Sequence, residues 1–202
     1  MTDVAAVAIG AQPERLLAAV RDGVGETATA PSLAEIGEAV RSVRAPLVWL
    51  LDARAAPSEG ALAALLGHGY EPAVSMPVDH RGAPVEALLG RFTESDKAGI
   101  LEAVRNRRVP LRHTWVISML VGRDTVLGEP APDPARFGAY AGTEWTARVF
   151  SSSPGMLIPA SRVLVGADMR GSLRDALRMA RTGVWRRGET LRELHRSAVG
   201  GR

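Results

Sequence analysis

Residues 47–60 read LVWLLDARAAPSEG, and this stretch decides the fold class. A run of apolar residues ends in Asp52, and the turn-forming pair Pro57-Ser58 follows soon after. A continuous apolar run of this kind is typical of a strand that is covered on both faces, as in a parallel sheet. The stretch therefore predicts a buried strand with Asp52 at its carboxyl end, where ligands of α/β sheets bind.

Strand-like and helix-like segments alternate along the rest of the chain. Ser32 and Glu35 have the spacing of a capping box at the start of one helix, and Ser58 is the expected cap of the next. The alternation predicts an α/β domain over residues 1–165, with a mostly parallel central sheet flanked by helices, and a basic helical extension over 166–202. The expected strands are 4–10, 46–52, 73–79, 114–124 and a strand-turn-strand at 156–165; the expected helices are 13–23, 32–43, 58–69, 94–108, 142–150 and 173–196.

Composition excludes several classes of protein. The 202 residues, 46% of them hydrophobic, suit one domain with a sizeable core. The absence of cysteine excludes disulfides, Cys-zinc sites and a thiol nucleophile. No basic stretch precedes the short apolar run near the N-terminus, and no apolar stretch approaches the roughly 20 residues of a membrane-spanning helix. We therefore expect a cytoplasmic protein. Nucleic acid is not expected as a partner, because aromatics are only 4% of the chain and no binding motif appears.

Charge is distributed unevenly along the chain. The net charge is +3, and residues 162–202 contain ten arginines and four acidic residues, which leaves residues 1–161 at −3. Helical spacing of four, four and three separates Arg170, Arg174, Arg178 and Arg181. Such a stripe suits an anionic membrane surface, with a peripheral location at the membrane, or an acidic partner; a solvated helix face is the alternative.

Asp52 and Arg54 are the first candidate site residues. A carboxylate at a strand end can hold a divalent cation that bridges a diphosphate, or it can cap the following turn through its side chain. Arg54, two residues on, argues against a metal, because its guanidinium would itself bind phosphate oxygens. The alternative for Arg54 is a solvated loop arginine.

Two further groups of polar residues are candidates. Glu144 is expected in the first turn of a helix capped by Gly142 or Thr143, where a carboxylate is favoured electrostatically and can pair with Arg148. A cluster before the expected strand at 114–124 suits a sugar, with an aromatic face for the ring and donors for hydroxyls; the alternative for its lone histidine is a structural hydrogen bond. That cluster is Arg112, His113 and Trp115.

In this order the segments resemble glycosyltransferase family 2, which has the GT-A fold, and in particular actinobacterial galactofuranosyl- and rhamnosyltransferases that build cell-wall polysaccharide. The resemblance implies sugar transfer from a nucleotide-sugar donor to a glycan, cell-wall or small-molecule acceptor. It also implies a donor site at Asp52, a catalytic base near Glu144 and an acceptor side at Arg112, His113 and Trp115. The segments that carry it are VAAVAIGAQPERLLAAV (4–20), APLVWLLDARAAPSEGALAALL (45–66), PLRHTWVISMLVGRDTV (110–126), FGAYAGTEWTARVF (137–150) and LIPASRVLV (157–165).

The departures from the family pattern fall on the chemistry. Only Asp52 remains of the Asp-x-Asp motif, and Arg54 replaces the acid that shares the Mn²⁺ or Mg²⁺ ion. Gly142 stands at the base position, so that only the later acid, Glu144, remains. The family's next strand, whose Asp contacts the nucleobase, is expected to be missing, since little but GVGETATA (23–30) separates the first two helices. These losses predict that turnover is weak or absent and that the protein binds no cofactor. The alternative is a pseudoenzyme that serves as a scaffold for an active glycosyltransferase.

Overall fold

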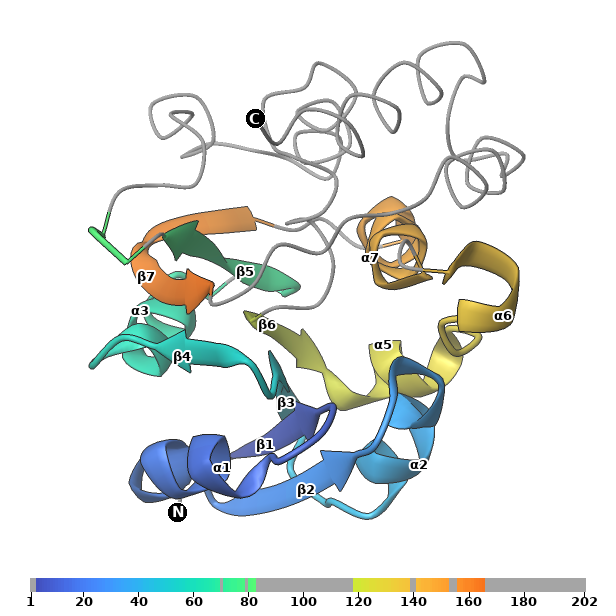
Figure 1. The fold of residues 1–202 in the computed structure, drawn as a ribbon, viewed down its shortest axis with the longest axis horizontal. Helices are drawn as coiled ribbons and strands as arrows, with labels where there is room; N and C mark the ends of the chain where they lie inside the picture. The colour runs from blue at the N-terminus through green and yellow to red at the C-terminus, as the bar shows by residue number, and fades with distance from the viewer. Residues whose placement is uncertain are drawn as a thin grey trace, which may run out of the picture.

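The computed structural model describes residues 3–69, 71–78, 80–82, 118–138, 141–152 and 156–165. Seven strands form one sheet with helices on both faces (Figure 1). The strands are β1 Val4–Ile9, β2 Glu26–Ala30, β3 Leu47–Asp52, β4 Ala55–Pro57, β5 Ala73–Val78, β6 Ser118–Gly122 and β7 Met156–Val165. The helices are α1 Glu14–Val20, α2 Ile36–Arg41, α3 Ala61–Gly67, α5 Arg123–Gly128, α6 Pro134–Phe137 and α7 Ala141–Ser152, with short 3-10 turns at Arg21–Gly23 and Leu33–Glu35.

The sheet is mostly parallel in strand direction, as expected. Its order is β2-β1-β3-β6-β5-β7-β4. The pairs β1–β2, β1–β3 and β5–β7 are parallel, whereas β6 runs antiparallel to both of its neighbours and β4 runs antiparallel to β7. Five strands therefore share one direction, and only β6 and β4 oppose it. The first half of the sheet, β2-β1-β3, has three consecutive parallel strands whose carboxyl ends lie together.

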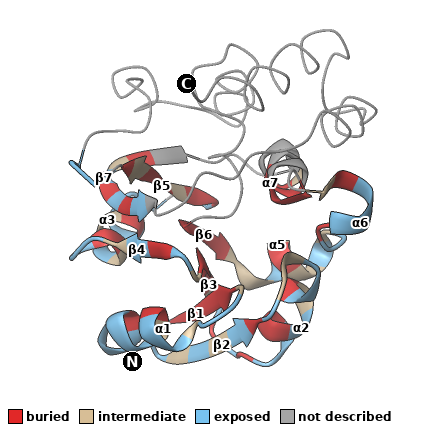
Figure 2. Ribbon diagram, viewed as in Figure 1, coloured by how far each residue is buried: buried red, intermediate tan, exposed pale blue. Residues whose placement is uncertain are grey.

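Two separate hydrophobic cores lie on the two faces of the sheet. On β1, Val4, Ala6 and Ala8 pack with residues of α1 and α3, whereas Ala5, Val7 and Ile9 pack with residues of α2, α5 and α7. This alternation is the period of two that a strand imposes. Figure 2 shows buried residues along the central strands and exposed residues on the outer helices. A sheet covered on both faces explains why residues 47–52 read as one apolar run.

A chain of buried polar side chains crosses four strands within the α1–α3 face. The Trp49 indole N–H donates to Ser118 Oγ at 3.0 Å. Ser118 Oγ lies 2.6 Å from Ser75 Oγ, which lies 2.7 Å from Ser161 Oγ. All four residues are buried. These hydrogen bonds link β3, β6, β5 and β7. They reach β7 where the register of β7 against β5 shifts, between Ser75 and Met76.

The structure corrects several details of the sequence-based predictions. The strand expected to be missing is present as β2, formed by Glu26–Ala30, although it ends in Ala30 rather than in an acid. Residues 156–165 form one strand with a register shift, not a strand-turn-strand. The strand expected at 114–124 gives way to α5 at Arg123. The expected capping box is incomplete, because the Ser32 hydroxyl donates to the Glu35 carboxylate and makes no capping bond to the backbone.

A further correction concerns Ser58, which does not cap α3. The residue before that helix is Gly60, in a left-handed conformation with φ of 75°. Ser58 instead bonds to β7, with its amide and its hydroxyl both donating to the Arg162 carbonyl at 3.0 and 3.1 Å. Together with the β4–β7 pairing of Ala55 with Val165, this bond holds the segment after Asp52 against the sheet.

Candidate functional site

The carboxyl ends of β1, β2 and β3 meet at one place. Ile9 is in register with both Ala30 and Asp52, the last residues of the neighbouring strands. Two further bonds connect the loops beyond them: the Gly10 amide donates to the Ala30 carbonyl, and the Ala53 amide donates to the Ile9 carbonyl, both at 2.8 Å. Such a meeting of parallel strand ends is where α/β sheets bind ligands.

Gly10 belongs to this place for a conformational reason that the sequence-based prediction did not use. Its φ is +117°, a region that side chains rarely adopt, and a Cβ there would lie 3.6 Å from the Ala53 Cβ. A glycine directly after an apolar strand is the signal that could have identified it. The glycine is needed for this backbone conformation, since a Cβ at 3.6 Å would make only ordinary van der Waals contact.

Asp52 and Arg54 form a forked ion pair at the end of β3. Arg54 Nε donates to Asp52 Oδ1 and Arg54 Nη2 donates to Oδ2, each at 2.9 Å. The Arg54 amide also donates to Oδ1 at 2.8 Å, which closes a turn through the aspartate side chain. Asp52 thus caps its turn, as one of its two predicted roles requires, and it also holds the Arg54 side chain in place.

The two partners differ in exposure. The Asp52 side chain is 7% exposed and the Arg54 side chain is 49% exposed. Hydrogen bonding to Asp52 raises the pKa of Arg54 above its ordinary value, with burial acting in the opposite direction. Arginine is already charged throughout the working range of pH, so Arg54 remains a cation there. The site therefore pairs a cation on a half-exposed side chain with a buried carboxylate.

A divalent cation does not fit this arrangement as it stands. Mg²⁺ and Mn²⁺ bind carboxylate oxygens, and both Asp52 oxygens already accept bonds from Arg54. Within the described ranges there is no group of three or more acidic, histidine or cysteine side chains that could complete a coordination shell. An ion at Asp52 would therefore have to bind directly beside the guanidinium, which has a charge of the same sign.

Most of the other candidate residues cannot be placed beside this pair. Arg112, His113 and Trp115 lie outside the described residues, as do Arg170, Arg174, Arg178 and Arg181 and the extension at 166–202. The helix expected from residue 142 is present as α7, but it begins at Ala141, so Gly142 and Thr143 lie within it. The side chain of Glu144 is not described, and its pairing with Arg148 remains a prediction.

Arg148 and Trp145 lie on α7 together with Glu144. Arg148 Nη1 donates to Glu129 Oε2 at 2.9 Å and Nη2 donates to the Pro130 carbonyl at 3.0 Å, which ties α7 to the segment after α5. The Trp145 side chain is buried in the core on the α2–α5–α7 face. Asp52 follows Val48 and Leu50 in the alternation of β3, so it lies on this same face of the sheet.

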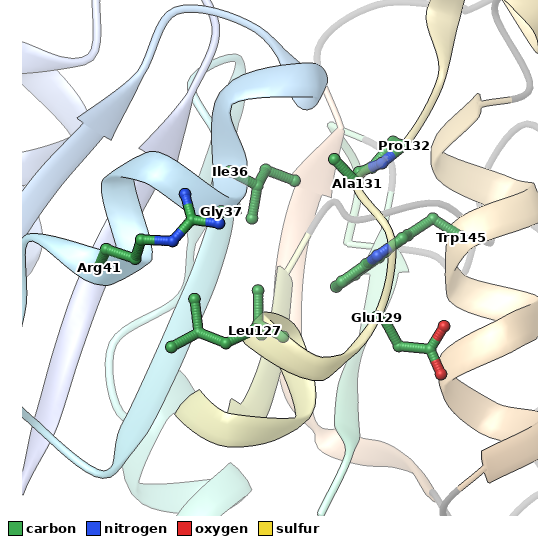
Figure 3. A pocket seen from close by; sticks show the side chains of 9 residues that line it. Ile36, Gly37, Arg41, Leu127, Glu129, Ala131, Pro132 and Trp145 are labelled. Atoms are coloured by element: carbon green, nitrogen blue, oxygen red, sulfur yellow. The ribbon is translucent and has the colours of Figure 1, made fainter.

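A small pocket of about 50 Å³ lies between α2, α5 and α7 (Figure 3). Trp145 reaches from α7 toward Ile36 and Gly37 of α2, and Leu127 of α5 lies below them. A space of this size suits one or two water molecules or a methyl group, not a nucleotide. We therefore take the carboxyl ends of β1, β2 and β3 as the candidate site.

Comparison with known proteins supports the fold and no more. No protein-family model matches the sequence, and no curated protein matches it. Among solved structures, the chain superposes on TarS of S. aureus with a TM-score of 0.60 and 8% sequence identity, over 100% of this chain and 44% of that one. The chain thus shares the mixed α/β fold of this GT-A-type neighbour.

Two further TarS structures, of residues 1–349, carry nucleotides. The complex with UDP matches with a TM-score of 0.55 at 8% identity, over 99% of this chain and 72% of that one. The complex with UDP-GlcNAc matches with a TM-score of 0.52 at 7% identity, over 100% and 73%. The chain thus spans less than half the length of the longer TarS chain, and the similarity shows a shared fold rather than a shared substrate.

Within the described part of the chain, no helix combines the length and the apolar character needed to cross a membrane.

Proposed function

We propose that this protein is a glycosyltransferase-like protein that binds a nucleotide sugar at the carboxyl ends of β1, β2 and β3. The observation that carries the proposal is the forked Asp52–Arg54 pair, at the end of a buried strand in a GT-A-type sheet. An arginine whose side chain is held in place and 49% exposed suits the diphosphate of such a donor, because a guanidinium makes charge-assisted bonds to phosphate oxygens.

The arrangement of the strand ends favours the same site. The segment after Asp52 is joined to the end of β1 by the bond from the Ala53 amide to the Ile9 carbonyl, beside the loop at Gly10. Structures of the same fold from S. aureus contain UDP and UDP-GlcNAc, so the fold can hold this class of ligand. We infer that the diphosphate lies against Arg54 and that the nucleoside extends toward the end of β2.

Sugar transfer needs a base for the acceptor hydroxyl, and we propose Glu144 for this role. The helix that carries it, α7, packs on the same face of the sheet as Asp52. Acceptor binding by Arg112, His113 and Trp115, and a cell-wall glycan as acceptor, belong to the same proposal and rest on the family resemblance alone. Since Gly142 occupies the family's base position, we expect turnover to be slow.

The second candidate is a pseudoenzyme that retains the fold and serves as a scaffold for an active glycosyltransferase. The observation in its favour is that Asp52 is already neutralised by Arg54, so the side chain is not offered to a metal. Both candidates predict a folded GT-A-type domain, and only the first requires that a nucleotide binds.

Nucleotide binding is tested by melting temperature. The purified protein is titrated with UDP, GDP and dTDP up to millimolar concentration, with Mn²⁺ or with EDTA. We expect at least one nucleotide to raise the melting temperature, because a ligand that binds the folded state stabilises it by mass action, by about 2.7 kcal/mol at 100 times its Kd. No shift with any nucleotide in either buffer would contradict donor binding and would favour the scaffold.

A further inference from the structure

The Asp52–Arg54 pair bears on how the diphosphate charge is compensated. The GT-A resemblance implies a divalent cation between two acidic side chains, but the geometry gives both Asp52 oxygens to Arg54. We propose that the Arg54 guanidinium takes the place of that cation, so that the site binds a nucleoside diphosphate without metal. This inference rests on the proposed function and deepens it.

Charge balance supports this substitution. Two carboxylates with a divalent ion have a net charge of zero, and Asp52 with Arg54 also has a net charge of zero. An arginine in place of an aspartate changes the side-chain charge by +2, which is the charge of the ion itself. The site therefore presents an incoming diphosphate with the same net charge as a metal-loaded acid pair. The positive charge now belongs to a side chain of the protein instead of a bound ion.

The geometry also gives the guanidinium a fixed position, which a substitute for an ion requires. Three hydrogen bonds between Asp52 and Arg54 hold the loop arginine, with its Nε and Nη2 on the carboxylate. Its side chain is 49% exposed, so part of it lies at the surface, where the strand ends meet. Asp52 acts here as a positioning residue: it is buried and orients the cation instead of sharing one with a second acid.

The loop that carries Arg54 is held from its other side as well. Ala55 is the first residue of β4 and pairs with Val165, and the Ser58 amide and hydroxyl bond to the Arg162 carbonyl. Arg54 thus lies in the short segment between the end of β3 and the start of β4. A segment fixed at both ends supports a preorganised anion site better than a free surface arginine does.

The test is isothermal titration calorimetry with UDP, GDP and dTDP in EDTA and in Mn²⁺. For the wild-type protein we expect equal affinity in the two buffers for whichever nucleotide binds. Arg54→Ala should weaken that affinity roughly 10- to 100-fold in both buffers, because a charge-assisted fork is lost. The affinity of Arg54→Lys should lie between those of the wild-type protein and Arg54→Ala, because lysine keeps the charge but cannot bond two oxygens with one planar group.

The decisive variant is Arg54→Asp, which restores two acids at the spacing of an Asp-x-Asp motif. This variant should bind nucleotide only when Mn²⁺ is present. It should also bind Mn²⁺ itself, which reduces the free-ion signal in electron paramagnetic resonance. The wild-type protein should leave that signal unchanged. Arg44→Asp is the matched control. It makes the same change of charge at an exposed residue before β3, at the opposite end of that strand, and should behave as wild type.

The outcomes separate the inference from the function on which it rests. Wild-type binding that requires Mn²⁺ would overturn the inference and leave donor binding intact. No binding of any of the three nucleotides in either buffer would overturn the proposed function itself. If Arg54→Asp proves unfolded by circular dichroism, Arg54→Gln, neutral and similar in length, replaces it: unchanged affinity in EDTA for that variant would show that the charge at this residue does not replace an ion.

Discussion

Trp145→Ala is expected to lower the free energy of unfolding by about 3–5 kcal/mol, the usual cost of removing a large buried aromatic side chain. Trp145 is 1% exposed and packs from α7 into the core that α2 and α5 share with the sheet. The pocket beside it shows that this region already contains unfilled space, so the cavity left by the truncation would be enlarged and not closed. For a domain of this size we expect the melting temperature to fall by roughly 6–20 °C.

Urea unfolding followed by far-ultraviolet circular dichroism measures this loss. Trp145→Phe keeps most of the apolar volume and should cost less than half as much. Leu66→Ala, at a residue that is 36% exposed on α3, is the control for truncating a large side chain outside the core, and it should change stability by less than about 1 kcal/mol. A loss below 1 kcal/mol for Trp145→Ala would contradict the packing of α7 against the sheet.

Ser75→Ala is expected to lower the free energy of unfolding by about 1–3 kcal/mol, although it removes only one oxygen atom. Its hydroxyl lies between those of Ser118 and Ser161, at 2.6 and 2.7 Å, so the substitution leaves two buried hydroxyls without this partner. Burying an unsatisfied polar group costs more than the hydrogen bond itself contributed. The measurement is again urea unfolding, and Thr27→Ala on the exposed side of β2 should stay within about 0.5 kcal/mol of wild type.

A double-mutant cycle distinguishes this network from a simple packing effect. Ser161→Ala alone should also destabilise the protein, because it removes one partner of Ser75. The double variant Ser75→Ala with Ser161→Ala should cost less than the sum of the two, since the second substitution removes a hydroxyl that the first left unsatisfied. Strict additivity would mean that the serines do not interact as their 2.7 Å separation requires.

The α/β class and most strands follow from the sequence because their signals are local. Residues 47–52 form the apolar strand expected of them, and the strand direction is mostly parallel as the alternation predicted. β2 was not foreseen because ETATA has no large apolar side chain, and its alternating exposure reflects a place at the edge of the sheet. β4 depends on pairing with β7, more than 100 residues away, which no local pattern reveals.

The candidate site was predictable in its residues but not in its geometry. The position of Asp52 and Arg54 at the strand end predicts a ligand site, and each residue also has a purely structural alternative. For Asp52 that alternative was capping the following turn, and the structure shows this bond together with a fork onto Arg54. The fork depends on the turn between them, since residues two apart in an extended strand point in the same direction but lie too far apart for three bonds. Gly10 was missed because its role lies in its backbone conformation.

Hydrogen–deuterium exchange with and without a saturating nucleoside diphosphate tests the proposed site most directly. If the donor lies at the strand ends, the nucleotide should slow exchange in the segments after β1, β2 and β3, namely at residues 10–12, 32–33 and 53–54, in the presence of EDTA. Amides within α3, on the other face of the sheet, should be unaffected. Protection confined to other segments, or none at saturation, would contradict a nucleotide site built around Asp52 and Arg54.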